Sequence, residues 1–238
     1  MAKIVFLNMN HGSLEVELLG FIGRLAHEVD AFCFQEADEK ILVKALKLLP
    51  TFSKQLAEKY VPNLGLYSVV TLINNKHQVS ADTKIMQDNL KIGLSQVTTF
   101  SLNGREVLLC NVHGVSQPGD KMDNSERILQ SKSIIDFALQ EKKPCIIGGD
   151  FNLGNTTKSV QLFEESAFVN LIKKYKITTT RTKKAWQTAS DNRETNGYWG
   201  KQLFADYVFV SPEIKVNGFE VVDIEISDHL PLILDFEV

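Results

Sequence analysis

The sequence predicts an α/β protein built from two packed mixed sheets, largely antiparallel, with helices on their outer faces. Short apolar runs of strand length alternate with longer amphipathic stretches along the chain. The pair Asn103-Gly104, set between two apolar runs, is a strong signal for a tight hairpin, which joins antiparallel strands. Two sheets packed face to face are the favoured architecture, although the spacing alone also permits a single mixed sheet.

The elements follow one another in a regular order. Strands are predicted at residues 3–9, 31–35, 66–73, 92–102, 105–113, 143–149, 202–211, 216–222 and 231–238. Helices are predicted at residues 14–29, 37–49, 125–141 and 155–166, where apolar side chains recur at helical spacing. Ser13 is placed to cap the first helix, and Pro50 to end the second. No repeat or linker interrupts the chain, so residues 1–238 are expected to form one domain.

Charge and cysteine content narrow the class of function. The formal net charge of −3 argues against a strong, non-specific grip on polyanions. It does not exclude a nuclease, because carboxylates gathered around a cation lower the net charge without repelling phosphate once metal is bound. Cys33, Cys110 and Cys145 lie in separate apolar runs, which favours reduced thiols and a cytoplasmic location. No apolar run approaches the roughly 20 residues that a membrane span needs.

Polar side chains recur where the predicted strands end. A carboxylate at the end of a buried strand is costly unless it is paired, hydrogen-bonded or bound to metal. One such residue means little, but several with Asn or His beside them suggest convergence on a single site. Oxygen-rich ligands indicate a hard cation such as Mg²⁺ rather than zinc. The set comprises Asn8, Asn10, Gln35, Glu36, His113, Asp150, Asn152, Asp206, Asp228 and His229.

Two motifs in this set carry a resemblance to a known family. Gly149-Asp150-Phe151-Asn152 follows an apolar strand, and Ser227-Asp228-His229 precedes the last one, with Gln35-Glu36 upstream of both. In this order they resemble the endonuclease/exonuclease/phosphatase family of deoxyribonuclease-like and exonuclease III-like enzymes, from residue 3 to residue 238. The resemblance implies a four-layer α/β/β/α sandwich. It also implies a hydrolase of phosphate esters that depends on Mg²⁺, with Mn²⁺ as a substitute.

The resemblance assigns metal-binding and catalytic roles to five of these residues that are not histidines. Glu36 would hold the Mg²⁺, with Asn8 and Asp228 nearby, directly or through water. Asp150 would orient or deprotonate the attacking water, and Asn152 would donate a hydrogen bond to that nucleophile or to the phosphorane oxygens. Structural alternatives exist, because Glu36 suits the first turn of a helix and Asp150 to Asn152 suit an Asx-type turn.

The histidines are assigned by the same resemblance. His229 would contact the scissile phosphate, with Asp206 fixing its tautomer and favouring the protonated ring. His113 matches a second phosphate-contacting histidine, but the glutamate that orients it in relatives is absent from residues 66–71. Asn10 stands where several relatives carry an aspartate, and this departure weakens any claim for a second tightly held metal.

Three further features bear on the substrate. Arg127 either binds phosphate or pairs with a carboxylate, and the sequence favours neither interpretation over the other. The basic stretch 173–201 contains Trp186 and Trp199, which suits a surface that tracks a nucleic-acid backbone and stacks bases, although a solvated loop face is the commoner explanation. Nucleic acid is therefore the expected substrate, largely by elimination. The alternatives are a small phosphorylated molecule or lipid headgroup and, less favoured, a non-catalytic protein that binds a phosphorylated ligand.

Overall fold

The computed structural model describes residues 1–62, 65–191 and 201–238, and within them two six-stranded sheets pack face to face. The first sheet has the strand order β11-β12-β1-β2-β4-β3, and the second has the order β5-β6-β7-β8-β10-β9. The strands of the first sheet are β1 (Ala2–Asn8), β2 (Ala31–Gln35), β3 (Phe52–Val61), β4 (Gly65–Asn74), β11 (Lys215–Val221) and β12 (Leu232–Glu237). Those of the second are β5 (Val79–Ile85), β6 (Leu94–Leu102), β7 (Arg105–His113), β8 (Cys145–Asp150), β9 (Val169–Asn170) and β10 (Asp206–Val210).

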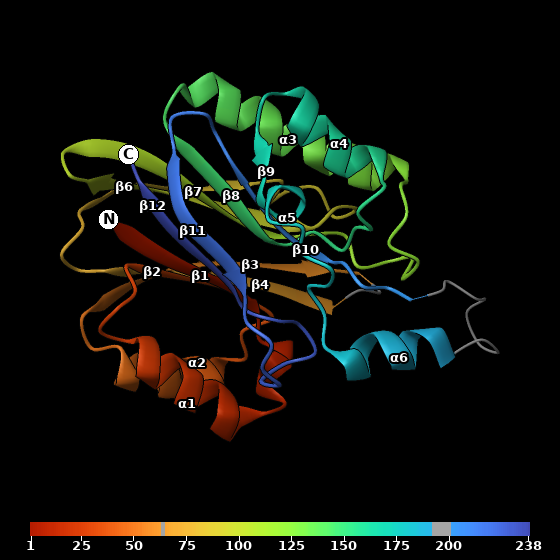
Figure 1. Ribbon diagram of the computed structural model, residues 1–238, viewed down its shortest axis with the longest axis horizontal. Coiled ribbons are helices and arrows are strands. Elements are labelled where there is room, and N and C mark those ends of the chain that lie inside the picture. Colours follow the sequence, from red (N-terminus) through yellow and green to blue (C-terminus); the bar gives the residue numbers. More distant parts are fainter. Residues whose placement is uncertain (63–64, 192–200) are drawn as a thin grey trace.

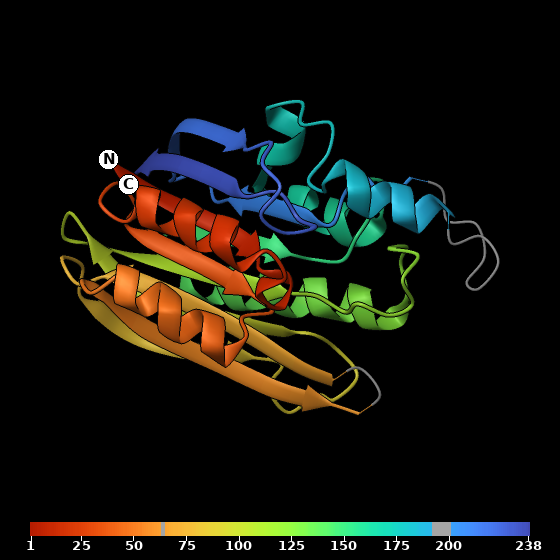
Figure 2. The same ribbon diagram turned by 90° about the horizontal axis from the view of Figure 1, so that it is seen from below.

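Helices cover the outer face of each sheet. The described helices are η1 (Asn10–Gly12, a 3-10 turn), α1 (Glu15–Leu25), α2 (Glu39–Leu48), α3 (Ser125–Glu141), α4 (Lys158–Glu165), α5 (Leu171–Lys174) and α6 (Lys183–Asp191). Figure 1 shows α1 and α2 below the first sheet and α3 and α4 above the second. Figure 2, seen from below, shows α1 and α2 lying across the strands of the first sheet. The predicted four-layer α/β/β/α sandwich is therefore confirmed.

Apolar side chains fill the spaces between these layers. One buried cluster joins the facing sides of the two sheets to α3 and α4, and includes Phe6, Cys110 and Phe209. A second cluster joins the outer side of the first sheet to α1 and α2, through residues such as Phe32 and Leu42. The sheets thus form a rigid base for the strand ends, as burial of this kind is the main favourable contribution to folding.

Several sequence expectations are corrected by tertiary structure. Ser13 does not cap α1: the residue before the helix is Leu14, and no side chain caps it. The predictions omitted β3 and β5, which are edge strands with many exposed polar side chains and so lack a strong apolar signal. The Asn103-Gly104 turn is confirmed, since φ angles of 53° and 79° place both residues in the left-handed region that a type I′ turn needs.

The β3 strand carries a buried lysine. The Lys59 ammonium donates hydrogen bonds to the carbonyl oxygens of Met86, Asn89, Ile92 and Gly93 at 2.7–2.9 Å. Burial lowers the pKa of Lys59 to about 8. This side chain therefore holds the 86–93 segment against the first sheet. The sequence does not indicate this role, because a lysine is normally expected to be exposed.

Asp30 is expected to stabilise the far end of the sandwich in a pH-dependent way. Its carboxylate accepts hydrogen bonds from the Lys3 amide at 2.8 Å and lies 2.7 Å from the Lys76 ammonium and 2.6 Å from His77 Nε2. Burial raises the pKa of Asp30, but Lys76, His77 and the Lys3 amide outweigh it and hold the pKa below its usual value. The stabilisation is therefore present above the unfolded-state pKa of about 4 and is lost as pH falls through the folded-state value.

We expect Asp30→Asn to lower the free energy of unfolding by about 1–3 kcal/mol at neutral pH. Urea unfolding at neutral pH and at acidic pH measures the difference between the two proteins. The difference should shrink as pH falls below about 4, where the wild-type carboxylate becomes protonated. A difference that stays constant with pH would show that the ionised form of Asp30 contributes nothing.

Candidate active site

The polar strand ends meet at one end of the two sheets because of how the strands pair. β1 and β2 run parallel with Asn8 opposite Gln35, and β7 and β8 run parallel with His113 opposite Asp150. β10 is antiparallel to β8 and places Asp206 opposite Asp150. The two sheets contact one another directly at this end, since Asn8 Nδ2 donates to Asp150 Oδ2 at 2.9 Å across 142 residues of sequence.

Glu36 stands directly after β2, with a left-handed φ of 50°. Its carboxylate lies 3.4 Å from Nε2 of His113 and 3.4 Å from Nε2 of His11. Burial raises the pKa of Glu36, but the His113 imidazole, the Asn8 amide and the charge of His229 outweigh it and hold the pKa well below its usual range. Glu36 is therefore an ionised carboxylate at neutral pH.

Asp150 is fully buried, and its carboxylate is held by amide groups. Oδ1 accepts from the Asn152 backbone N–H at 2.9 Å, which is the predicted Asx-type turn, and Oδ2 accepts from Asn8 at 2.9 Å. Burial raises the pKa of Asp150, but His229, Lys121 and His113 outweigh it, so the pKa lies below its usual value. Asp150 therefore both forms the Asx-type turn and contributes an ionised carboxylate to the site, two features that the sequence allowed to occur together.

His229 is paired with Asp206 as the sequence predicted. Its Nδ1 lies 2.9 and 3.0 Å from the two oxygens of Asp206, and its Nε2 lies 3.8 Å from both Asp150 Oδ2 and Asp228 Oδ2. Burial lowers the pKa of His229, but Asp206 and Asp150 outweigh it and raise the pKa to about 9. The ring is therefore an imidazolium at neutral pH. Ser227 fixes this segment to β1, because its hydroxyl donates to the Asn8 carbonyl oxygen at 2.7 Å.

His113 has an aromatic neighbour where relatives would have a carboxylate. The ring of Tyr67 lies 4.5 Å from the His113 ring, and the Tyr67 hydroxyl bonds to Ser116 at 2.9 Å. Among the described residues, neither ring nitrogen of His113 has a hydrogen-bond partner, and the nearest carboxylate is Glu36 at 3.4 Å. His113 thus keeps its nitrogens available to a ligand while Tyr67 supports the ring.

Arg127 does not reach the site, and its interpretation as a phosphate clamp is wrong. The side chain is 1% exposed, and its guanidinium lies 2.9 Å from an oxygen of Asp120. It also donates to the carbonyl oxygens of Val115, Pro118 and Met122. Arg127 therefore shapes the loop after β7, and the alternative of a carboxylate partner is confirmed.

Of the residues expected to contact the substrate, Asn10 lies beside the site and Trp186 does not line the neighbouring cavity. Asn10 lines a cavity beside Asp228, whereas Trp186, on α6, is not among its lining residues. The Trp186 ring instead lies 5.0 Å from the Lys201 ammonium. Trp199 lies outside the described residues. Within the basic stretch, Lys173 pairs with Glu164 at 2.5 Å, so part of that stretch is engaged by the fold itself.

Two cationic residues lie beside the site, and neither was assigned a place there from the sequence. The Lys121 ammonium donates to Asn152 Oδ1 at 2.7 Å, and Arg181 Nη2 lies 3.3 Å from Asp228 Oδ2. Burial lowers the pKa of Lys121 to about 8. Lys121 follows a run of turn residues and Arg181 lies in a basic run, so neither had a motif to mark it.

The donor set suits a hard divalent cation. Ligand atoms of Glu36, His113 and Asp150 all lie within 4.8 Å of one another, close enough for one ion to join them. Carboxylate oxygens are the donors that Mg²⁺ and Mn²⁺ prefer. The Asn8 amide nitrogen faces Asp150, so Asn8 orients that carboxylate. Among the described residues, Asp228 is not part of this cluster, nor of the second cluster that Asp150, Asp206 and His229 form; it contacts His229 and Arg181.

Carboxylates, amides and imidazoles gathered at one end of a double sheet define a metal-dependent hydrolase of phosphate esters. The chain belongs to the endonuclease/exonuclease/phosphatase family, whose model matches residues 6–229. The recognition made from the two sequence motifs is therefore confirmed. No curated protein matches the chain. Of the helices described, none has the length and apolarity needed to cross a membrane.

Solved structures of low sequence identity share the fold over the whole chain. A mannosyl-6-phosphatase of Bacteroides thetaiotaomicron is 15% identical, with a TM-score of 0.73 and 100% of both chains covered. The human Nocturnin catalytic domain is 18% identical, with a TM-score of 0.75, 99% of this chain covered and 94% of that one. A humanized D. rerio TDP2 is 14% identical, with a TM-score of 0.76, 100% of this chain covered and 99% of that one. At these identities the likeness describes the fold.

Proposed function

We propose that the chain hydrolyses phosphodiester bonds of nucleic acid, with Mg²⁺ as its cofactor and Mn²⁺ as a substitute, and that residues 1–238 act as one catalytic domain. The observation that carries the proposal is the convergence of Glu36, Asp150 and His229. Ligand atoms of Glu36 and Asp150 lie within 4.8 Å, and Asp150 lies 3.8 Å from His229. The two carboxylates can bind a cation, and the His229 imidazolium lies beside them. A phosphate group bound there would be held by a positive charge on each side, from the cation and from the imidazolium.

Glu36 would hold the cation, with Asn8 and Asp228 beside it. When bound, the cation would polarise a non-bridging phosphate oxygen and stabilise the negative charge of the leaving group. Asn8 contributes by fixing the Asp150 carboxylate through its 2.9 Å hydrogen bond, which keeps the two carboxylates in register. Asp228 contributes negative charge at the edge of the site that faces Arg181.

Asp150 would orient the attacking water. Its lowered pKa keeps it ionised at neutral pH, so it accepts a hydrogen bond from the water and takes the proton as the new P–O bond forms. The Asn152 amide has its oxygen engaged by Lys121 at 2.7 Å, which turns its nitrogen toward Asp150 and the reacting centre. Asn152 would thus donate to the nucleophile or to the equatorial oxygens.

His229 and His113 would stabilise the charge that grows on the phosphate oxygens. The His229 ring is protonated and is oriented by Asp206 at 2.9 Å, so its Nε2–H donates toward the reacting centre. His113, whose buried ring nitrogens have no protein hydrogen-bond partner among the described residues, supplies a second contact. Both groups are fixed before substrate arrives, so no reorganisation is needed in the transition state.

A phosphatase or phosphodiesterase acting on a small phosphorylated molecule or lipid headgroup is the second candidate. The arrangement of Trp186 favours it, because this ring is absent from the residues that line the cavity next to the site. A base-stacking platform is what a nucleic-acid substrate would use. Among the similar structures, the mannosyl-6-phosphatase is named for a small phosphorylated sugar.

The test of the proposed function is hydrolysis by the purified chain. We expect release of nitrophenol from bis-nitrophenyl phosphate with Mg²⁺, abolished by EDTA and restored by excess Mg²⁺ or Mn²⁺. Single-stranded and double-stranded DNA, RNA and phosphorylated sugars, assayed in parallel, separate the two candidates. Cleavage that survives EDTA would contradict the metal role, and cleavage of the sugars alone would favour the second candidate.

The cysteines support the proposed location of the protein. Cys33, Cys110 and Cys145 are free and buried. Three unpaired thiols suit a compartment that keeps cysteines reduced. We therefore propose that the protein acts in the cytoplasm.

A further inference from the structure

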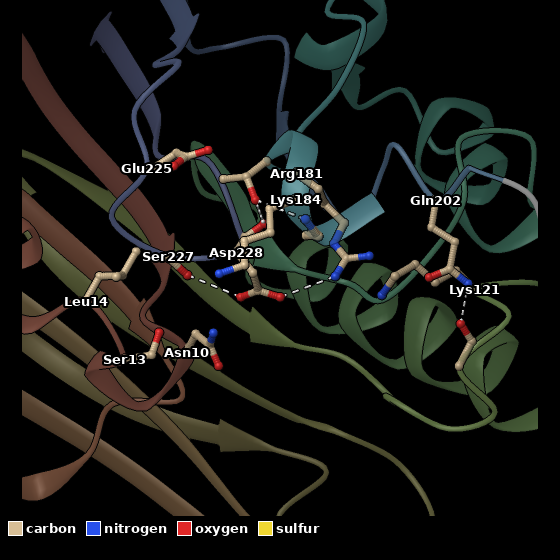
Figure 3. A pocket seen from close by; sticks show the side chains of 13 residues that line it. Asn10, Ser13, Leu14, Lys121, Arg181, Lys184, Gln202, Glu225, Ser227 and Asp228 are labelled. Carbon is tan, nitrogen blue, oxygen red and sulfur yellow. Dashed lines mark hydrogen bonds and ion pairs between the residues drawn. The ribbon is translucent and has the colours of Figure 1, made fainter. Parts of the chain in front are cut away.

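A cavity of about 710 Å³ opens beside the active site, next to the start of α6 (Figure 3). Three segments form its walls: η1 with the turn before α1 (residues 10–14), the loop 225–228, and residues 181–185 at the start of α6 together with Lys121 and Gln202. Asp228 belongs to both places, because it lines the cavity and lies 3.8 Å from His229 Nε2. The cavity is therefore continuous with the proposed catalytic centre.

Arg181 is held at the wall of this cavity by its backbone. It forms an antiparallel bridge with His229, and the Thr182 N–H donates to the Asp228 carbonyl oxygen at 3.0 Å. One oxygen of Asp228 lies 3.3 Å from the Arg181 guanidinium and 3.8 Å from the His229 ring, so at most about 7 Å separates these two cations. The position of Arg181 is thus tied to that of the catalytic histidine.

Two cations of the cavity, Arg181 and Lys121, have donors without a partner among the described residues. Arg181 Nε is buried and has no hydrogen-bond partner among the described residues. Lys121 is only 7% exposed, and of the side chains described no carboxylate lies within 4.0 Å of its ammonium. Within the described part of the chain its ammonium makes one hydrogen bond, to Asn152, whereas an ammonium has three donors. Buried donors of charged groups are costly to leave unpaired, so these donors suit an anion from outside the protein.

The charge of the cavity and the position of Asp228 narrow the kind of anion. Among the described lining residues of the cavity, three cations outnumber two carboxylates: Lys121, Arg181 and Lys184 against Asp228 and Glu225. The Asp228 carboxylate lies between Arg181 and His229. Because this carboxylate contacts both cations, we expect an anion bound by Arg181 to lie apart from the reacting phosphate, which favours two phosphates on separate ester oxygens over two joined by one bridging oxygen.

We propose that this cavity binds a second phosphate group of the substrate, carried on a separate ester oxygen of the same molecule as the scissile phosphate. The inference rests on the proposed function, since it names the class of substrate as doubly phosphorylated. Arg181 and Lys184 would contact the second phosphate, and Lys121 would lie between the two phosphate positions. A nucleoside with phosphates on both its 3′ and 5′ oxygens has this pattern, whether free or within a strand.

Binding of two nucleotides tests the inference without requiring turnover. Isothermal titration calorimetry with the full wild-type chain and Mg²⁺ compares adenosine 5′-monophosphate with adenosine 3′,5′-bisphosphate, and chromatography verifies that both ligands remain intact. We expect the bisphosphate to bind at least about tenfold more tightly, because the second phosphate makes charge-assisted hydrogen bonds with Arg181 and Lys184. The ratio of the two affinities is the readout, since changes that affect both ligands equally cancel.

Two variants and one control assign the effect to the cavity. Arg181→Gln should bring the affinity ratio to about one, and Lys184→Gln should reduce it about threefold. Lys183→Gln is the matched control, because Lys183 is exposed on the same turn of α6 and does not line the cavity. It should leave the ratio unchanged. A nearly equal effect of the Lys183 and Lys184 substitutions would indicate general attraction by the basic surface and overturn the inference.

The failures of the two proposals are distinguishable. A wild-type affinity ratio of about one overturns the second-phosphate site, even if phosphodiesters are hydrolysed. No measurable affinity for the bisphosphate does the same. A ratio above about ten that Arg181→Gln abolishes supports the site, and absence of any hydrolysis would then contradict only the proposed function.

Discussion

Replacing Asp150 by asparagine is expected to lower kcat by about 10³-fold or more, because the amide cannot accept the proton of the attacking water. Asn has almost the same size and can still accept the hydrogen bonds from Asn8 or from the Asn152 amide at 2.9 Å. KM should therefore change little compared with kcat. Initial rates on bis-nitrophenyl phosphate over a range of substrate and Mg²⁺ concentrations measure the two parameters separately.

The loss of kcat in Asp150→Asn could also result from unfolding of the variant, and the free energy of unfolding tests this explanation. Asp150 lies opposite Asp206 in the strand register, and its charge raises the pKa of Asp206 after the larger effect of burial. Burial and this repulsion oppose the ionised carboxylate, but His229, Lys121 and His113 favour it more strongly. We therefore expect Asp150→Asn to lower the free energy of unfolding by about 1–3 kcal/mol while the chain stays folded. Asp136→Asn, an exposed change on α3, is the matched control for activity. Retention of more than a tenth of wild-type kcat by Asp150→Asn would reject the assigned role.

The sequence was sufficient for elements whose signals are local. The strand at residues 31–35 and the helix at residues 125–141 have the predicted bounds, since an apolar run that ends at Gln35 defines the first and apolar side chains at helical spacing define the second. The edge strand β3 was missed because its signal depends on distant partners. From the sequence alone, Lys59 would be expected on the surface. In the structure, its ammonium is surrounded by four carbonyl groups of the loop 86–93.

The same distinction applies to the candidate site. Asp150, Asp228 and His229 stand next to apolar strands in recognisable motifs, and Asn8 joins the two motifs by bonding to both Ser227 and Asp150. Tyr67 was overlooked because the sequence there was searched for a carboxylate, whereas the structure supports His113 with an aromatic ring. Arg181 reaches Asp228 only through a backbone bridge between segments 47 residues apart. Pairings of this kind depend on the closed fold and have no local pattern.

His229→Gln is expected to lower kcat by about 10²–10³-fold, because it removes a fixed positive charge from the phosphate oxygens. The imidazolium owes its charge to carboxylates that outweigh the effect of burial, chiefly Asp206 at 2.9 Å and Asp150 at 3.8 Å. Asp206→Asn should therefore act through the histidine, and we expect it to lower kcat by about 10–100-fold. His27→Gln, an exposed change at the end of α1, is the matched control.

A double-mutant cycle separates this coupled unit from two independent contributions. If Asp206 acts only by orienting and charging His229, then the Asp206→Asn/His229→Gln double variant should be no slower than His229→Gln alone. Independent roles would multiply the two losses, giving a variant at least tenfold slower than either single one. The second result would mean that Asp206, buried and opposite Asp150 in the register, itself acts on the reacting groups. The measurement is kcat at saturating substrate, with the free energy of unfolding of all four proteins as the control for folding.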